Sequence, residues 1–396
     1  MKRKLLSLLC SLMCASGAWA ADLPTSGSGQ FYLKNVGTGT FLKGDSYWGT
    51  KAVVWDDPYY ITLTYIRDGV YTIQSQQNNG NENQYFTTVE DLYVDGAACD
   101  MTFTEVDAVN HYYTINNGKG NLYATPVTED GATLYKVMAG DVSTDYAKWQ
   151  ILNKAELTAA LGNATSTVPV DASFYIKDAG IDVYSVNASS WIITKYKDGS
   201  EDKNTVELGG GGHAGHNAES WNKATFSMSQ TLSELPHGKY KVTCNGYYRW
   251  NSAEGENNNQ AAITAHANGT EVLNAKFYAG AKEISLMSVA GDADAITFCK
   301  NQGWGDNTPN YQWQAAACFT KGYYLNTIDD ILVTSGSLEI GVKKTTQAGM
   351  DWAVFDNFKL YYYGNAVEVY STASFNSGGT ATANTWYAFT VNDAGI

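Results

Sequence analysis

The stretch Phe31-Tyr-Leu-Lys-Asn-Val-Gly-Thr-Gly-Thr-Phe-Leu42 opens a pattern that returns twice in the first third of the chain. The second copy begins Tyr71-Thr-Ile-Gln-Ser75 and the third is Tyr113-Thr-Ile-Asn-Asn-Gly-Lys-Gly-Asn-Leu-Tyr123, at intervals of about 40 residues. In each copy an alternating run of aromatic and β-branched residues leads into an Asn- and Gly-rich turn and a second short aromatic run. This order is typical of a β-hairpin. The pattern therefore predicts a threefold repeat of hairpins.

A threefold hairpin repeat restricts the architecture. A β-propeller needs at least four blades, so the closure that suits three units is a β-trefoil. The composition also favours strands, because the 396 residues include 28 Tyr, 11 Trp and 38 Gly but only 6 Pro. Aromatic residues and Thr favour pleated strands, whereas Gly and Asn favour the turns between them. We expect an all-β protein.

The N-terminus reads as a cleavable signal peptide over residues 1–20. Lys2-Arg-Lys4 precedes the apolar run Leu5–Cys14, which is too short to span a bilayer, and Ala18-Trp-Ala20 offers a small-x-small cleavage site. Leu9 and Met13 are too large for the position before a lipid-modified cysteine. We therefore expect a secreted protein, extracellular or at the cell surface, cleaved after Ala20 and not inserted in the membrane afterwards.

The net charge of the chain limits the class of ligand that it can bind, and its cysteines raise the question of disulfides. A formal net charge of −14 repels phosphate backbones and argues against nucleic acid as a partner. The alternative interpretation is that the charge serves only to keep the protein soluble. Four cysteines follow the signal peptide, and none is close to another in sequence. Buried thiols and a disulfide both remain open for them. They are Cys99, Cys244, Cys299 and Cys318.

The remaining chain divides into four parts. Residues 22–152 form the trefoil-like domain. Residues 153–167 contain a helix, which Asn153 can cap, and a linker. Residues 168–365 return to strands joined by long loops, which suggests a β-sandwich. We interpret residues 366–396 as the start of a further, apparently truncated β module.

Two further segments of the sandwich region are assigned from the sequence. We take Ala293–Cys299 as one of the strands and Gln314–Phe319 as a short helix.

The first domain resembles the ricin-like β-trefoil lectin family. The motif Tyr146-Ala-Lys-Trp149-Gln-Ile151 looks like the closing strand of that family, with Gln after Trp instead of before it. The family pairs an Asp with a stacking aromatic in each sugar pocket. The resemblance therefore implies a pocket in the first copy with Asp45 and Trp48, although Trp48 has a second reading as a hairpin packing residue.

The second domain resembles the galactose-binding-domain-like jelly roll found in carbohydrate-binding modules, as in secreted modular proteins of the Bacteroidetes type. The residues that carry this resemblance are Asp171-Ala-Ser-Phe174, Ala218-Glu-Ser-Trp221-Asn, Leu235-Pro-x-Gly-x-Tyr240, Gly246-Tyr-Tyr-Arg249 and Trp352-Ala-Val-Phe-Asp356-Asn-Phe-Lys-Leu360. It implies a jelly-roll β-sandwich. Within this set we expect Trp221 and Trp352 to lie in the core.

Two loops of this domain combine aromatic and polar residues, as sugar sites do. Arg249-Trp250 leads into a very hydrophilic loop, and Trp304 and Asp306 lie in Asn301-Gln-Gly-Trp-Gly-Asp-Asn307. We predict that Arg249, Trp250, Trp304 and Asp306 bind carbohydrate. Both tryptophans have a second reading as loop packing, and Arg249 has one as a salt-bridge partner.

Asp356 corresponds to a position that binds structural Ca²⁺ in several modules of the jelly-roll type, so the resemblance implies a possible calcium site. Its second reading is a hydrogen-bonded aspartate within a strand. His213 and His216 lie in a glycine-rich run that we interpret as a loop, and we expect no other cofactor. The sequence contains no Gly-x-Ser-x-Gly elbow or phosphate-binding loop.

The leading hypothesis is a secreted, non-catalytic protein that recognises a poly- or oligosaccharide, or a glycoprotein, by aromatic stacking. One alternative is the N-terminal accessory part of a glycoside hydrolase or peptidase whose catalytic module is absent. Another is a structural adhesin that binds protein. The sequence leaves the oligomeric state open.

Overall fold

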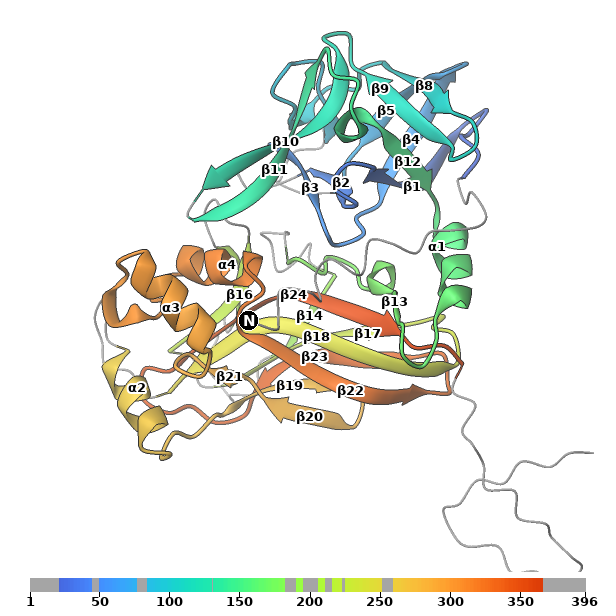
Figure 1. Ribbon diagram of the computed structural model, residues 1–396. Helices are drawn as coiled ribbons and strands as arrows, with labels where there is room; N and C mark the ends of the chain where they lie inside the picture. The colour runs from blue at the N-terminus through green and yellow to red at the C-terminus, as the bar shows by residue number, and fades with distance from the viewer. Residues whose placement is uncertain are drawn as a thin grey trace, which may run out of the picture.

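A computed structural model shows two β units, one above the other (Figure 1). It describes residues 21–44, 50–76, 84–129, 131–181, 190–194, 206–210, 216–222, 225–250 and 259–365. The tail 366–396 and the leader 1–20 lie outside the described residues. No helix in the described ranges has the length and apolarity that a membrane span requires.

The described residues of the first unit form twelve strands. They are β1 (Ser28–Asn35), β2 (Phe41–Gly44), β3 (Ala52–Trp55), β4 (Ile61–Arg67), β5 (Val70–Gln74), β6 (Tyr85–Phe86), β7 (Val94–Gly96), β8 (Met101–Asp107), β9 (Tyr112–Asn116), β10 (Asn121–Glu129), β11 (Ala132–Gly140) and β12 (Trp149–Leu152).

Strand pairing defines a β-trefoil. Strands β1, β4, β5, β8, β9 and β12 each pair antiparallel with the next, and β12 returns to β1, which closes a barrel. The other strands form the three hairpins β2–β3, β6–β7 and β10–β11. Each third of the unit thus contributes two barrel strands and one hairpin, and the predicted threefold repeat is confirmed.

The repeat also explains the barrel core. Leu33, Ile73 and Ile115 occupy matching places in the first strand of each copy, and all are buried. Trp149 of the closing strand is fully buried, and its indole Nε1 donates to the carbonyl of Leu122 at 2.9 Å. Because successive side chains of a strand point to opposite faces, the alternating pattern places these apolar residues inside the barrel.

A short helix, α1 (Lys154–Ala160), follows the barrel. Asn153 caps it, because its side chain accepts hydrogen bonds from the backbone N–H groups of Ala155 and Glu156. The Glu156 carboxylate accepts the N–H of Asn153 at 2.6 Å and completes a capping box.

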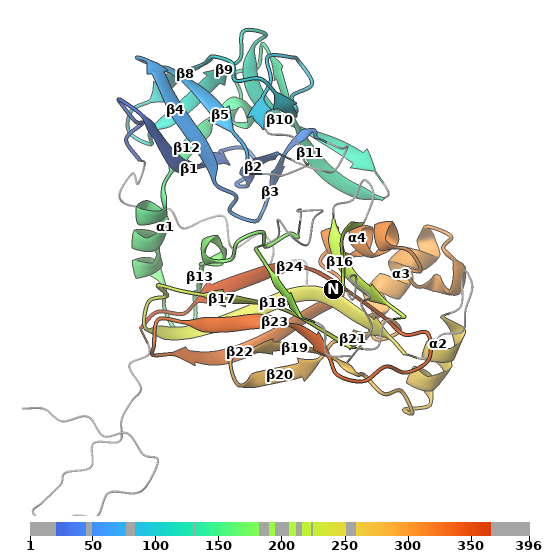
Figure 2. The same cartoon turned by 180° about the vertical axis from the view of Figure 1, so that it is seen from behind.

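The second unit is a β-sandwich, and its described residues include three α-helices, which lie at one end (Figures 1 and 2). Its strands are β13 (Val170–Asp171), β14 (Ile192–Thr194), β15 (Glu207–Gly210), β16 (Asn217–Trp221), β17 (Phe226–Leu232), β18 (Gly238–Arg249), β19 (Ala275–Ala279), β20 (Lys282–Ser285), β21 (Met287–Ser288), β22 (Leu325–Val333), β23 (Leu338–Lys344) and β24 (Trp352–Tyr362). The helices are α2 (Gln260–Ala267), α3 (Ala293–Asn301) and α4 (Gln312–Thr320).

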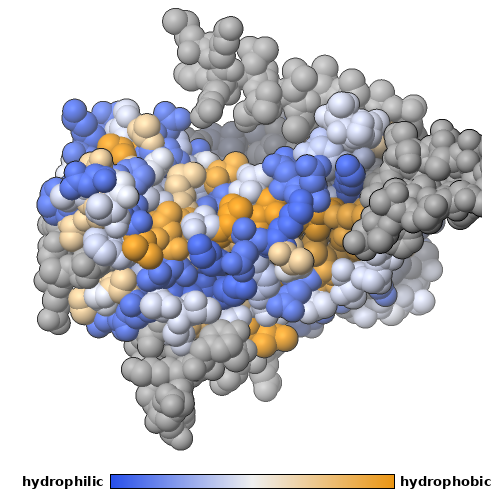
Figure 3. All heavy atoms as spheres, turned by 90° about the horizontal axis from the view of Figure 1, so that it is seen from below, coloured by the Kyte–Doolittle hydropathy of each residue, from blue (hydrophilic) through white to orange (hydrophobic). Residues whose placement is uncertain are grey.

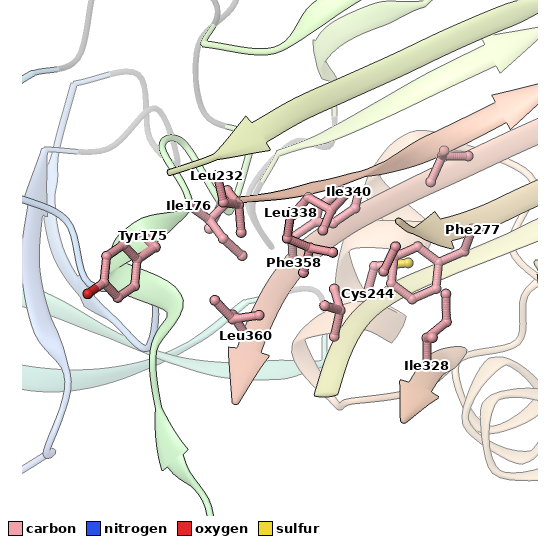
Figure 4. Packing of buried hydrophobic residues seen from close by; sticks show 14 of the residues in the cluster. Tyr175, Ile176, Leu232, Cys244, Phe277, Ile328, Leu338, Ile340, Phe358 and Leu360 are labelled. Atoms are coloured by element: carbon pink, nitrogen blue, oxygen red, sulfur yellow. The ribbon is translucent and has the colours of Figure 1, made fainter. Parts of the chain in front are cut away.

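The strands form two sheets that pack face to face. The larger sheet runs β15-β16-β24-β18-β21, with β13 on β24 and β22 on β18, and the smaller runs β14-β17-β23-β19-β20. Buried side chains such as Phe277, Ile340 and Phe358 fill the space between them (Figure 4). The predicted all-β class, a trefoil followed by a sandwich, is confirmed.

One element was predicted wrongly. Ala293–Cys299, taken as a strand, belongs to the helix α3. Asp292 starts this helix, because its Oδ1 accepts the N–H groups of Asp294 and Ala295 at 3.0 and 3.1 Å. The predicted helix near Gln314–Phe319 lies within α4.

The two units share buried surface. Tyr32 of the barrel belongs to the same apolar cluster as the sandwich core, and Val53 and Leu134 pack with buried residues of α3 and α4. Lys359 of β24 forms an ion pair with Asp56, which follows β3. The interface is therefore apolar with an ionic contact.

The face of the sandwich seen from below carries apolar side chains. Figure 3 shows them as a band between hydrophilic residues. Exposed apolar residues of β20 and β22, the strands at the lower edge in Figure 1, include Ile284, Leu325 and Leu332.

Candidate functional site

Three strands of the larger sheet meet at the helical end of the sandwich. β16 and β18 end at Trp221 and Arg249, and β24 begins at Trp352, between them. The register pairs Trp221 with Trp352 and Trp352 with Arg249. Directly paired residues in a sheet point to the same face. The three side chains therefore form one row, which we call the Arg249 row.

Arg249 is buried beside the ring of Trp352. Only 5% of the residue is exposed, and the guanidinium carbon lies 4.8 Å from the centre of the Trp352 ring. Its Nη1 donates to the side-chain oxygens of Asn259 and Asn310 at 3.0 and 2.6 Å. Its Nε has no hydrogen-bond partner within the described residues. Burial lowers the pKa of Arg249, but a guanidinium stays charged at any physiological pH.

Asn259 connects Arg249 to the loop after α3. Its Nδ2 donates to the hydroxyl of Thr308 at 2.6 Å and to the carbonyl of Pro309 at 3.1 Å. Its backbone N–H donates to Asp306 at 3.3 Å. Asp306 has a left-handed backbone, with φ at 56°. The structure thus brings two of the predicted residues, Arg249 and Asp306, into one hydrogen-bond network.

A carboxyl pair lies in the adjacent row. The register places Glu207 opposite Glu219, on the same face as the Arg249 row. Glu219 accepts a hydrogen bond from the Trp352 indole at 2.6 Å. Burial raises the pKa of Glu219 to about 7. Charge repulsion and a hydrogen bond from Glu207 add to this shift, while the hydrogen bond from Trp352 and the charge of Arg249 oppose it. A carboxyl of this kind can donate or accept a hydrogen bond near neutral pH.

Further polar atoms without partners lie beside the pair. Asn217, two residues before Glu219 on β16, is fully buried and donates to the backbone carbonyl of Gln312 at 2.9 Å. Within the described part of the chain, the side-chain oxygen of Asn217 and the Nε2 of Gln312 have no partner. Buried polar groups are normally satisfied, so the unused atoms call for an explanation.

Aromatic rings border this region. Trp304 is half-buried, with its ring centre 5.4 Å from Phe298 and 5.2 Å from Trp313 in edge-on geometry. Tyr311 stacks on Trp313 with ring centres 6.3 Å apart and is 37% exposed. The rings thus form a cluster on the loop that supplies Asn310.

Trp221 departs from the prediction that it belongs to the core, because it is 46% exposed. Trp221 is the last residue of β16, and the neighbouring β15 pairs only as far as Glu219. No described strand beyond β16 covers the ring. Trp352, in contrast, is buried as predicted.

The other predicted site residues lie elsewhere. Trp250 follows Arg249 but packs against the apolar cluster between the sheets, since adjacent side chains of a strand alternate between faces. Asp45 and Trp48 lie outside the described residues, so the trefoil pocket stays a prediction.

The calcium position also stays a prediction. Asp356 is buried on β24, and its Oδ1 accepts the N–H of Asn357 at 2.6 Å. The described ranges contain no cluster of three or more His, Cys, Asp or Glu side chains suited to a metal ion. His213 falls outside those ranges.

Sequence reasoning missed Glu219, Asn259 and Asn310. The polarity of Glu219 within a strand was visible in the sequence, but its indole partner Trp352 lies 133 positions away. The two asparagines lie in loops whose course a sequence does not reveal.

No protein-family model matches this chain, and no curated protein matches it. Among solved structures, TmCBM61 in complex with β-1,4-galactotriose is similar over 48% of this chain and 97% of its own length, with 19% identity and a TM-score of 0.26. The ricin B-like lectin of Macrolepiota procera in complex with lactose is similar over 33% of this chain and 99% of its own, with 15% identity and a TM-score of 0.27. Cry35Ab1 is similar over 85% of this chain and 90% of its own, with 14% identity and a TM-score of 0.25.

Proposed function

We propose that this chain is a secreted, non-catalytic carbohydrate-binding protein, and that the Arg249 row binds the saccharide. The observation that carries this proposal is the buried Arg249 guanidinium, which lies against Trp352 with an unused Nε–H among the described residues. Buried donors are normally satisfied, so this N–H is available to an acceptor that the described residues do not supply.

The surrounding chemistry suits a sugar. A pyranose ring offers C–H groups on its faces and hydroxyls at its edge, so a binding site needs an aromatic face next to donors and acceptors. The exposed ring of Trp221 can supply the first, and the Arg249 guanidinium and the Glu219 carboxyl the second. The rings of Trp304 and Tyr311 offer a further aromatic surface for a longer chain.

At the Glu207–Glu219 pair, the carboxyl geometry favours binding over hydrolysis. Glycoside hydrolases separate their two carboxyl groups by about 5 Å or more, so that a sugar bond or a water fits between them. Glu207 and Glu219 are hydrogen-bonded to each other, which leaves no such space.

Secretion is supported by the sequence of residues 1–20. Expression of the full chain in a secreting bacterial host, followed by N-terminal sequencing of the medium or surface fraction, tests it. We expect the mature protein to begin at Ala21. A chain that starts at Met1 and stays in the cytoplasm would contradict this part.

A glycan array probed with the full chain tests binding, followed by calorimetry on the sugars that bind. Galactotriose and lactose are included as probes. Trp221→Ala removes an exposed ring, and we expect affinity to fall about tenfold, as the loss of a stacking contact predicts. Arg249→Lys keeps the charge but loses the planar donor fork, and we expect a loss of similar or larger size. Ile192→Ala, at an exposed residue of β14, is the matched control.

The outcomes separate the sites. Binding that survives both Trp221→Ala and Arg249→Lys but is lost in Trp48→Ala would move the site to the trefoil. An absence of binding to any glycan would refute the proposed function. Attachment to a glycoprotein that persists after its sugars are removed would favour the adhesin alternative.

A further inference from the structure

Two thiols touch in the core beneath the site. Cys299 of α3 and Cys318 of α4 are fully buried, with their Sγ atoms 3.7 Å apart. A disulfide needs about 2.05 Å between sulfurs, so closure requires the sulfurs to approach by less than about 2 Å. Both cysteines are thiols in this structure.

The other described cysteines are placed differently. Cys99 is in the barrel, and its thiol donates to the carbonyl of Phe86 at 2.9 Å. Cys244 is fully buried on β18, in the cluster between the two sheets, whereas Cys299 and Cys318 belong to the cluster under the helices. The contact is therefore specific to one pair.

The chain between the two cysteines carries part of the site. It contains Trp304, Asp306 and Asn310, and the last of these binds the Arg249 guanidinium. A covalent link at the base of α3 and α4 would restrict the conformations open to this segment, in the unfolded chain above all.

We propose that Cys299 and Cys318 form a disulfide when this chain folds in an oxidising compartment, and that this bridge holds the segment carrying Trp304 and Asn310 in place. The inference rests on the proposed secretion for its oxidant, but not on sugar binding. A failure of glycan binding leaves it intact, and a failure of the bridge leaves the Arg249 row intact.

The oxidant is a disulfide-exchange reagent, either a protein thiol oxidase or a small disulfide such as oxidised glutathione. One cysteine thiolate attacks the oxidant disulfide, forms a mixed disulfide and releases one thiol. The second cysteine attacks the sulfur of the first, forms the protein bridge and releases the second thiol. Two electrons pass to the oxidant, and the two cysteine protons end on the released thiols.

The burial of the two thiols determines when in folding the disulfide forms. Burial raises the pKa of the Cys318 thiol, and the thiolate is the attacking form, so the packed protein exchanges slowly. Oxidation therefore takes place before α3 and α4 pack together. Refolding in oxidised glutathione forms the bridge, whereas adding the same reagent to the reduced, folded protein forms it much more slowly.

The test refolds the full chain with oxidised glutathione, and in parallel with a reductant. Each sample is denatured, alkylated and digested for mass spectrometry. We expect the oxidised sample to contain one peptide that joins Cys299 and Cys318, about 2 Da lighter than its two thiol parts. Cys99 and Cys244 are alkylated in both samples. Alkylation of Cys299 and Cys318 in the oxidised sample, or bridges to other cysteines, would overturn the proposal.

Limited proteolysis tests whether the bridge holds the segment that carries Trp304 and Asn310 in place. Reduction should speed tryptic cleavage after Lys300 several-fold in the wild type and leave the rate in Cys318→Ser unchanged. Equal rates in the oxidised and reduced wild type would refute the restraint. Cys244→Ser is the matched control, and its cleavage should respond to reduction as the wild type does. If Cys318→Ser fails to fold, the two wild-type samples decide the result on their own.

Discussion

Glu219→Gln should make the protein more stable at neutral and alkaline pH. The carboxyl of Glu219 has an ordinary pKa of 4.5, raised in the folded state to about 7. The folded protein therefore holds this proton over a pH range in which the unfolded chain has lost it. By linkage, the contribution of Glu219 to stability falls as pH rises from about 4.5 to about 7.

The size of the stability change follows from the pKa shift of Glu219. One pKa unit corresponds to about 1.4 kcal/mol, so the ionised Glu219 costs up to about 3 kcal/mol above neutral pH. Glutamine removes this cost, since it carries no charge to bury. Its amide oxygen still accepts the Trp352 indole N–H, and its amide N–H groups still donate to Glu207.

Urea unfolding at a series of pH values measures the effect. The free energy of unfolding of Glu219→Gln minus that of the wild type should widen by about 2 kcal/mol between about pH 5 and about pH 8. Glu90→Gln makes the same charge change at an exposed residue of the barrel unit, and its difference from the wild type should stay flat. A pH-independent difference for Glu219→Gln would refute the raised pKa of Glu219 in the folded protein.

Three further changes test the packing. Asp351→Ala leaves the Lys344 ammonium buried without its partner at 2.6 Å, and calorimetry should show a loss of about 3–5 kcal/mol. Gly341→Ala places a Cβ 2.2 Å from the carbonyl oxygen of Met228, and urea unfolding should show a loss of about 1–3 kcal/mol or more. Lys359→Met removes the ion pair between barrel and sandwich, which is partly exposed, and thermal unfolding should show a loss of only about 1 kcal/mol.

The trefoil could be predicted because its information is local. Each repeat contains a whole hairpin, with the Asn and Gly residues that turn it and the alternation that buries one face. The closing strand was implied by the resemblance to the ricin-like lectin family, and β12, which carries Trp149, does pair with β1. Three copies of one pattern in one sequence favour this closure.

The helix α3 could have been predicted, but it was not. Asp292 and Asp294 form a helix start in the sequence itself, with a capping side chain and a negative charge in the first turn. The apolar residues after them are compatible with either a strand or a helix. The capping signal should have decided between the two.

Much of the site could not be predicted, because its geometry comes from pairing over long distances. Arg249 and Asp306 were chosen for their residue types, and the structure joins them through Asn259, which no sequence pattern marked. Trp221 was expected in the core because it belongs to the set of residues that carries the jelly-roll resemblance. Whether it is covered depends on where β15 stops pairing, and sequence periodicity does not encode that.

The apolar contact between barrel and sandwich has a consequence for multivalency. Tyr32, Val53 and Leu134 of the barrel pack into apolar clusters of the second unit. The two units therefore do not move independently, as domains joined by a flexible linker would. A sugar site on the barrel would lie at a fixed distance and orientation from the Arg249 row. For two sites at a fixed separation, avidity is large when the binding epitopes on the glycan have the same separation. It is negligible when they do not, because the two sites then cannot be occupied at once.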